Sequence, residues 1–294
     1  LFRSFEAISW YLRYRHNGAD FYDLFGPIER SRKGNAYIGG YHTSLIYDRP
    51  RQLDLHVEVA HFRGLDTLPN EQNVATTFST LTTAEIGLDY SNKRKSLGAV
   101  DHEKGVGWDL VLGAENANSE TFGKIRGGLD FGFSLPMQYS SLWFYTDLGV
   151  ASGDRVNPLS RFYFGAYGNN YVDKGEVTRY RSHNSFPGFE INELAARRFV
   201  KSVVEWNAPP VRFEEVGIPS FYLKSLRPAA FLGTLYADPD DGTPSRTFNS
   251  VGLQLDLSFT IAHRLPMTLS IGYAAGYYRG DRQGDEVMVS LKIL

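Results

Sequence analysis

The sequence contains no cysteine among its 294 residues, and it contains only 3 methionines. The absence of cysteine argues against a disulfide-stapled scaffold and excludes a thiolate metal site. No apolar stretch approaches the ~18 residues that a transmembrane helix requires. The formal net charge is only -2, which gives no electrostatic basis for binding nucleic acid.

What is present is a two-residue alternation of apolar and polar side chains along the whole chain. It is clearest over residues 106–115, 124–135 and 251–262. Side chains on a strand point to opposite faces in turn, so each run has one apolar face and one polar or charged face. The alternation predicts strands over 6–15, 36–48, 53–65, 79–91, 105–117, 120–135, 140–152, 198–208, 222–237, 248–263, 267–279 and 285–294.

Strands of this length favour an all-β protein, namely a transmembrane antiparallel β-barrel of about 12 strands that forms a single domain over 1–294. A tilted strand needs ~9–11 residues to cross a bilayer, whereas strands of soluble proteins usually have ~5–6. The aromatic content of 14%, with 18 Tyr and 20 Phe, suits the aromatic girdles of such barrels. The alternative is a soluble sandwich or propeller that buries the apolar face instead.

The lengths of the connections support the barrel. Polar connections follow the first, third, seventh and ninth strands, and the longest covers 154–197, whereas tight turns such as 49–51 follow other strands. Long loops on one rim and short turns on the other are typical of bacterial outer-membrane barrels, with both termini on the periplasmic rim. Two connections depart from this pattern: 91–104 is too long and 118–119 is too short. The chain begins at Leu1 without a signal peptide, so we expect a processed product.

The predicted inward face is rich in charge. Residues expected to face a wet lumen are Asp109, Lys124, Arg126, Asp130 and Asp256. Residues expected to face lipid are Leu110, Leu129, Leu255 and Phe259. Basic side chains facing lipid at mid-bilayer would cost ~2–4 kcal/mol each, whereas paired charges in a hydrated lumen cost little. Three interpretations remain open: a salt-bridged interior that stiffens the wall, a selective pore, and a lumen that holds a plug.

The sequence does not predict an enzyme, a cofactor or a metal site. His183, Asn184 and Ser185 have the side-chain types of a hydrolase triad, but adjacent residues cannot form its hydrogen-bond relay. His56 and His61 are five residues apart on a predicted strand, so they face opposite sides. No phosphate-binding loop, nucleophile elbow or metal motif is present.

The connection over 154–197 is too long to be a simple turn, and it is not of low complexity. Segments 161–165 (Arg-Phe-Tyr-Phe-Gly) and 185–189 (Ser-Phe-Pro-Gly-Phe) place aromatics beside Gly and Pro. A connection this long is functional or disordered, and its composition favours an ordered loop that enters the barrel. The alternative is a surface loop held by its own aromatics.

At these residues the chain resembles the superfamily of outer-membrane assembly and secretion barrels that includes BamA, TamA and the two-partner secretion transporters. A strand with Asp147 and Gly149 leads into 161–166, then Gly188-Phe189 follows, and then five final strands, the first carrying Glu205. Segments 19–27 and 205–210 are also similar to barrels fused to TolB-like β-propellers. The resemblance implies a 16-stranded barrel, with the missing strands supplied by the parent chain or another subunit.

The resemblance also implies that an arginine of the long loop reaches an acid of the lumen. The family's arginine position before the Gly-aromatic pair is Pro187 here, so Arg179 or Arg181 is expected to contact Glu205. We therefore predict a lock between loop and lumen formed by Arg179, Arg181, Gly188, Phe189 and Glu205.

The sequence favours a membrane anchor or plugged pore for a periplasmic module or partner complex, located in the bacterial outer membrane. The alternative is a protein assembly or translocation barrel of the BamA/TamA type. The expected partners are outer-membrane lipid, lipopolysaccharide and a protein partner or missing periplasmic domain. The client, the solute and the oligomeric state do not follow from the sequence.

Overall fold

The computed structural model describes residues 8–16, 34–69, 74–97, 99–167, 172–173, 178–214, 216–240 and 242–293. Within these residues the chain consists of β-strands, connections and two 3-10 turns, η2 (Pro158–Ser160) and η3 (Arg179–Arg181). Neither turn is long and apolar enough to serve as a membrane-spanning helix.

Twelve long strands form one large antiparallel sheet, and they correspond to the twelve strands predicted from the sequence. They are β1 (Ile8–His16), β2 (Asn35–Asp48), β3 (Arg51–Arg63), β4 (Thr80–Arg94), β5 (Lys104–Ala117), β6 (Glu120–Ser134), β7 (Ser141–Ala151), β11 (Arg198–Asn207), β14 (Phe221–Asp238), β15 (Arg246–Ile261), β16 (Leu265–Tyr278) and β17 (Asp281–Ile293). The prediction misplaces one boundary by four residues, because the last strand begins at 281 instead of 285.

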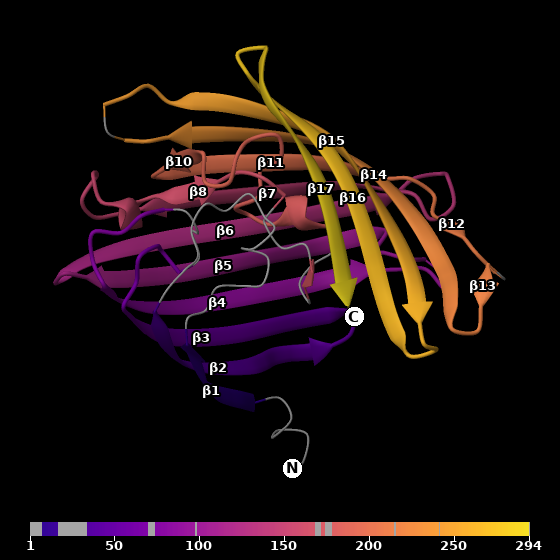
Figure 1. Cartoon of the computed structure of the whole chain (residues 1–294), viewed down its shortest axis with the longest axis horizontal. Helices are drawn as coiled ribbons and strands as arrows, with labels where there is room; N and C mark the ends of the chain where they lie inside the picture. The colour runs from indigo at the N-terminus through magenta and orange to yellow at the C-terminus, as the bar shows by residue number, and fades with distance from the viewer. Residues whose placement is uncertain are drawn as a thin grey trace.

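Long strands that follow one another along the chain lie side by side in the sheet, as Figure 1 shows. Five short strands were not predicted: β8 (Phe162–Phe164), β9 (Val172–Asp173), β10 (Leu194–Ala196), β12 (Val211–Arg212) and β13 (Gly217–Ile218). Of these, β12 and β13 pair with the first part of β14, and β8 pairs with β10 in a separate two-stranded sheet. Two residues of β9 pair in parallel with the end of β17.

The alternation gives the sheet two different faces. Along β7, the even-numbered Leu148 and Val150 are about half exposed, whereas Tyr145 and Asp147 are buried. Of the four residues predicted to face outward, Leu110, Leu129 and Leu255 are exposed.

The prediction is wrong for the exposure of Phe259, which is only 9% exposed. Its ring packs against that of Phe221, with 5.5 Å between centroids. Phe221 lies just before a register shift between Leu223 and Ser225. A bulge of this kind re-aims side chains locally.

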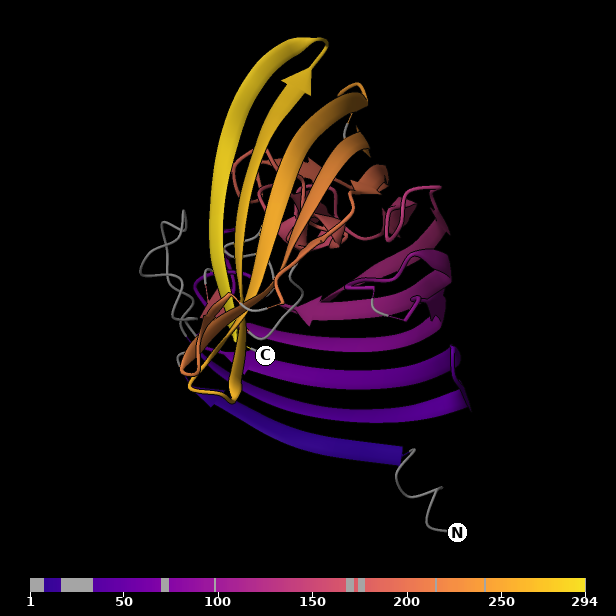
Figure 2. The same cartoon turned by 90° about the vertical axis from the view of Figure 1, so that its right-hand side faces the viewer.

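The sheet is strongly curved, so that it has a concave inner face and a convex outer face. In Figure 2, β2 to β4 cross the view, whereas β14 to β17 rise steeply over them. A closed barrel is not found in the described residues. There β1 pairs only with β2, and β17 pairs with β16 and β9, so the first and last long strands do not pair with each other.

The connections explain both departures from the loop-length pattern. The connection between β4 and β5 lies on the short-turn rim, and it carries Asp101, whose carboxylate contacts Arg181 and Arg227 inside the curve of the sheet. The connection between β5 and β6 is the two-residue turn Asn118–Ser119, in which both residues have positive φ angles (50° and 67°). Because the number of long strands is even, β1 begins and β17 ends on the same rim, the short-turn rim.

The described residues of the longest connection (152–167, 172–173 and 178–197) lie inside the curve of the sheet. Figure 2 shows its short strands between the steep strands and the strands opposite them. Its side chains share apolar clusters with residues of β11, β14 and β15. We call residues 152–197 the interior connection.

We predict that cysteines replacing Trp10 in β1 and Val289 in β17 will not form a disulfide. The reason is that β1 and β17 are not hydrogen-bonded neighbours. The chain has no native cysteine, so the test is free of background. A matched pair replacing Trp10 and Tyr41, which face each other across β1 and β2, should cross-link with a short bifunctional reagent. Efficient cross-linking between positions 10 and 289 would contradict the open sheet.

Candidate functional site

The interior connection is held first by aromatic packing near the long-loop rim. The rings of Phe162 and Phe164 both meet Phe199 of β11 edge-on, at 4.9 and 4.7 Å between centroids. Phe189 meets Phe248 of β15 at 5.5 Å. Edge-to-face pairs of this kind contribute beyond their buried area. The described part of the connection is therefore an ordered core, as its composition predicts.

Two tyrosines carry this packing deeper into the curve of the sheet. Tyr167 and Tyr180 are both 0% exposed. The ring of Tyr180 stacks on Phe231 of β14 at 4.1 Å, and Tyr167 meets the same ring edge-on at 5.9 Å. Burial of these rings fixes the segment that carries Arg181, one residue after Tyr180.

Arg181 of η3 forms a forked ion pair with Glu205 of β11. Its Nε and Nη2 atoms donate to the two carboxylate oxygens at 2.7 and 2.5 Å. The Glu205 side chain is fully buried and also accepts from Asn207 Nδ2 at 2.5 Å. The Arg181 guanidinium lies 5.3 Å from the ring centroid of Tyr145. A bidentate pair combines strength with a fixed geometry.

The Arg181 guanidinium keeps its charge in this setting. Burial alone lowers the pKa of Arg181, but the Glu205 carboxylate outweighs burial and holds that pKa well above its usual value. Arg181 therefore carries its positive charge at neutral pH.

The pair belongs to a larger group, which we call the charged cluster: Asp101, Arg181, Glu205, Arg227 and Asp256. Asp101 Oδ2 accepts from Arg181 Nη2 at 3.0 Å and from Arg227 Nη1 at 2.5 Å. Arg227 Nη2 also donates to Asp256 at 2.6 Å. Three carboxylates thus alternate with two guanidinium groups.

Asp101 is the member of the charged cluster that lies between the two arginines. Burial raises the pKa of Asp101, but hydrogen bonds from His102 and the charges of Arg181 and Arg227 outweigh burial and hold that pKa well below its usual range. Asp101 is therefore ionised at neutral pH.

A second set of contacts fixes the backbone of the interior connection. Glu286 of β17 accepts from the backbone amides of Tyr167 (3.1 Å) and Gly188 (3.3 Å). Lys201 of β11 donates to the carbonyl of Ser182 at 2.5 Å, and Ser250 of β15 donates to that of Pro187 at 2.5 Å. Strands on several sides of the curve therefore hold one connection.

Gly188 is required by this close approach. Its φ angle is +91°, a left-handed value that favours glycine. A Cβ at this position would collide with the backbone of Ala275 and Gly276 in β16. The neighbouring Phe189 is 5% exposed and packs on Phe186 and Phe248.

Four of the residues predicted to face the lumen form ion pairs on the inner face of β4 to β7. Arg126 lies 2.8 Å from Asp109 and 3.6 Å from Asp147. Lys124 pairs with Glu115 at 3.1 Å, and Asp130 pairs with Lys93 at 2.5 Å. The fifth, Asp256, belongs to the charged cluster. The inner face is therefore charged but largely paired.

Of the residues predicted to form the lock, the structure brings Arg181 and Glu205 into contact, whereas Gly188 and Phe189 contact β16 and β15 instead. The side chain of Arg179 lies outside the described part of the structure. Sequence reasoning missed Asp101 and Glu286. The unexpected length of the connection 91–104 was the sequence signal for Asp101. The alternation of Glu286 with Val287 could have indicated that Glu286 faces inward.

No metal-binding group that includes a histidine is found in the residues that the structure describes. His56 lies between Glu85 (3.3 Å) and Asp89 (3.1 Å), and no group of three or more His, Asp or Glu side chains there could hold a metal ion. Burial and the charges of Arg126, Lys201 and Lys124 lower the pKa of His183 to about 3, so this ring is neutral at pH 7.

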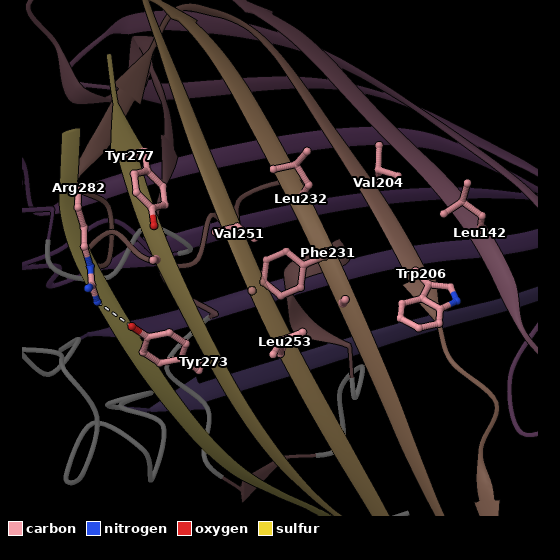
Figure 3. Close-up of a pocket in the computed structure, with 13 residues that line it drawn as sticks. Leu142, Val204, Trp206, Phe231, Leu232, Val251, Leu253, Tyr273, Tyr277 and Arg282 are labelled. Atoms are coloured by element: carbon pink, nitrogen blue, oxygen red, sulfur yellow. Dashed lines mark hydrogen bonds between the residues drawn. The ribbon is translucent and has the colours of Figure 1, made fainter. Parts of the chain in front are cut away.

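The outer face carries an apolar groove of about 530 Å³ across β7, β11 and β14 to β17 (Figure 3). Its lining includes Trp206, Leu232, Leu253 and Tyr273. Arg282, at the β17 side of the groove, donates to the Tyr273 hydroxyl at 2.7 Å, and Figure 3 shows this bond as a dashed line.

Comparison with models of known protein families and with curated proteins finds no match.

We predict that Arg181→Ala lowers the free energy of unfolding by about 3–5 kcal/mol, because it leaves the Glu205 carboxylate buried without a cation. The measurement is urea unfolding followed by tryptophan fluorescence. The matched control is Arg198→Ala, which breaks exposed ion pairs with Asp238 and Asp240 and should cost under about 1 kcal/mol.

The double variant Arg181→Met with Glu205→Leu distinguishes the cost of an unpaired buried charge from the loss of side-chain packing. Removing both charges should recover most of the lost stability, since an apolar replacement leaves no buried charge. Equal losses for Arg181→Ala and Arg198→Ala would show that the pair does not hold the connection.

Proposed function

We propose that this chain forms most of the wall of a β-barrel in the bacterial outer membrane, plugged by its own interior connection. In this proposal the barrel anchors a periplasmic module or a partner complex to the membrane. The observation that carries the proposal is the distribution of side chains over the two faces of the sheet. Charges gather inside the curve, and large apolar side chains gather outside it.

The exposed outer face has the composition of a lipid-facing band. Side chains of Leu, Val and Ile that alternate with inward residues are about half exposed on strand after strand, for example Leu112, Ile125, Leu148, Val200, Leu232, Leu253 and Ile271. Exposed apolar area on this scale is rare in soluble monomers and marks an interaction surface. The twelve long strands have 9 to 18 residues, enough for a tilted crossing at ~9–11 residues.

Exposed aromatics lie near both ends of the strands. Trp108, Phe133 and Trp206 lie toward the short-turn rim, and Tyr37 and Tyr236 toward the opposite rim. Tyr and Trp favour the two membrane interfaces, because their rings combine an apolar body with a polar atom. Two such aromatic belts support the proposal that lipid covers the apolar band between them.

In the part of the chain that the structure describes, one edge of β1 has no strand partner, and the outer edge of β17 is paired only at Leu291 and Lys292, with β9. A bare strand edge in lipid leaves backbone N–H and C=O groups without partners, at several kcal/mol each. We therefore propose that further strands, from the parent protein or a second subunit, close the barrel between β1 and β17. This fits the 16-stranded barrel that the family resemblance implies.

The anchor role rests on how firmly the interior connection is held. Aromatic packing, the Arg181–Glu205 pair and the Glu286 contacts all fix it to the wall. Withdrawing it would break each of these together, which suits a permanent plug. The alternative is an assembly or translocation barrel of the BamA/TamA type. It is favoured by the end of β17, which accepts the two residues of β9 as an added strand.

The groove on the outer face supports a lipid partner. Its walls are apolar, and Arg282 lies beside the β16–β17 turn on the long-loop rim. An acyl chain in the groove would bring a phosphate of lipopolysaccharide, or of another anionic lipid, toward this arginine.

We predict that a fluorophore on a cysteine replacing Leu253 will be quenched by brominated lipid acyl chains in reconstituted vesicles. Leu253 is 60% exposed in the middle of the outer face. The control is the same fluorophore replacing Asp281, at the tip of the β16–β17 hairpin, which should remain in water and escape quenching. Equal, weak quenching at both positions would contradict membrane insertion of this face.

A further inference from the structure

The apolar groove on the outer face crosses six neighbouring strands, β7, β11 and β14 to β17. Its lining begins at Tyr277 and Arg282, near the long-loop ends of β16 and β17, and it ends at Leu142 and Trp206, near the short-turn ends of β7 and β11. With ~4.8 Å between neighbouring strands, the groove is about 24 Å long. The hydrocarbon of one leaflet is ~15 Å deep, half of a ~30 Å core. The groove is therefore long enough for one acyl chain.

The floor of the groove is preformed. It contains the small residues Ala230, Gly252 and Ala275. Phe231 is also part of the lining, and the ring of Tyr180, from the interior connection, stacks on Phe231 at 4.1 Å. Packing inside the curve of the sheet thus fixes the floor before any ligand binds. A site that needs no rearrangement binds with a smaller entropic cost.

A charged side chain lies at the β17 end of this otherwise apolar groove. The register between β16 and β17 shifts after Gly276, so that Gln283 is skipped and Arg282 lies opposite Tyr277. A bulge of this kind re-aims the side chains around it. The shift places Arg282, instead of Gln283, beside Tyr277 on the outer face.

Arg282 is held in place by two polar contacts. Its Nη2 atom donates to the Tyr273 hydroxyl at 2.7 Å, as Figure 3 shows, and lies 3.0 Å from Asp285 Oδ1. Within the described residues both contacts use Nη2, which leaves the Nε and Nη1 hydrogens for a ligand. The Arg282 side chain is 50% exposed. An ionisable residue on a lipid-facing surface is costly and marks a functional site.

We propose that the groove is a specific site for the lipid A part of lipopolysaccharide, with one acyl chain in the groove and a phosphate on Arg282. A guanidinium group binds phosphate through a fork of two N–H donors. This inference rests on the proposed function, in which the outer face lies in lipid and the long-loop rim faces the lipopolysaccharide leaflet. It goes further, because a lipid-facing surface needs only an exchanging shell of lipid, whereas this site retains one molecule. Asp285 weakens the site, since its carboxylate competes with the phosphate for Arg282.

The test counts the lipids bound to the purified full chain in detergent by native mass spectrometry, with purified lipid A as the probe. We expect one lipid A to bind more tightly than any further copy. Arg282→Ala should weaken this first binding step roughly tenfold, which corresponds to about 1.4 kcal/mol. Arg282→Lys keeps the charge but loses the fork, so its affinity should lie between the two.

The matched control is Arg198→Ala. Arg198 is an exposed arginine on the same rim, and it also pairs with aspartates, Asp238 and Asp240. Its replacement should leave the binding of lipid A unchanged.

Two further variants separate the groove from the charge of the rim. Val251→Trp puts a large ring into the groove and should weaken binding, whereas Leu129→Trp, on the outer face of β6 away from the groove, should not. Asp285→Asn removes the competing carboxylate and should strengthen binding. A purely structural role for the contact between Arg282 and Asp285 would not produce this gain.

Equal losses for Arg282→Ala and Arg198→Ala, unchanged binding after Val251→Trp, or no gain after Asp285→Asn would overturn the lipid A site. Phosphatidylethanolamine bound as tightly as lipid A would also overturn it, because the head group of that lipid carries no net charge. All of these measurements are made in detergent. Their failure is therefore distinct from failure of the lipid-quenching test, since a face can lie in lipid without retaining one molecule of it.

Discussion

The interior of this protein is organised by the need to pair a carboxylate that water does not reach. Glu205 lies on the wall with its side chain fully buried. An unpaired carboxylate there would cost several kcal/mol. Its cation, Arg181, does not come from the wall but from a connection that must fold inward to deliver it. Pairing Glu205 therefore requires the interior connection to stay inside the sheet.

The remaining contacts follow from that placement. With Arg181 beside Glu205, Tyr180 reaches Phe231, and the backbone of Gly188 comes close enough to β16 for Glu286 to bond its amide. Each contact is weak compared with the cost of leaving Glu205 alone. Together they make the interior a packed core with a charged centre, the reverse of a soluble sandwich, whose charges face outward.

Much of the sheet could be predicted from the sequence, because the alternation of apolar and polar residues shows which side chains of a strand share a face. The twelve long strands followed from the two-residue period, and so did the outward Leu110 and Leu129. Phe259 was misjudged because its exposure depends on a bulge and on the ring of Phe221, neither of which the period encodes. The closure of the sheet could not be predicted for a similar reason. Whether β1 meets β17 depends on the curvature of the whole sheet.

The candidate site was partly predictable. The loop composition and the family resemblance pointed to an arginine near residue 180 and an acid at 205, and the structure brings Arg181 to Glu205. Asp101 could not be placed, since its role needs a fold in which two connections from opposite rims meet. Its only trace in the sequence was a turn that was longer than expected. Places where a sequence departs from a simple structural pattern, such as this long turn, are expected to be functional or strained sites.

The central claim is that the interior connection is held against the wall, and amide hydrogen exchange of the full chain tests it most directly. The amides of Tyr167 and Gly188 bond to the carboxylate of Glu286, so they should exchange about as slowly as those of β16 beside them. The exposed residues 242–245, in the connection between β14 and β15 on the same rim, provide the reference. Slow exchange over 178–189 and fast exchange over 242–245 is the predicted result. Equally fast exchange in both segments would contradict the account.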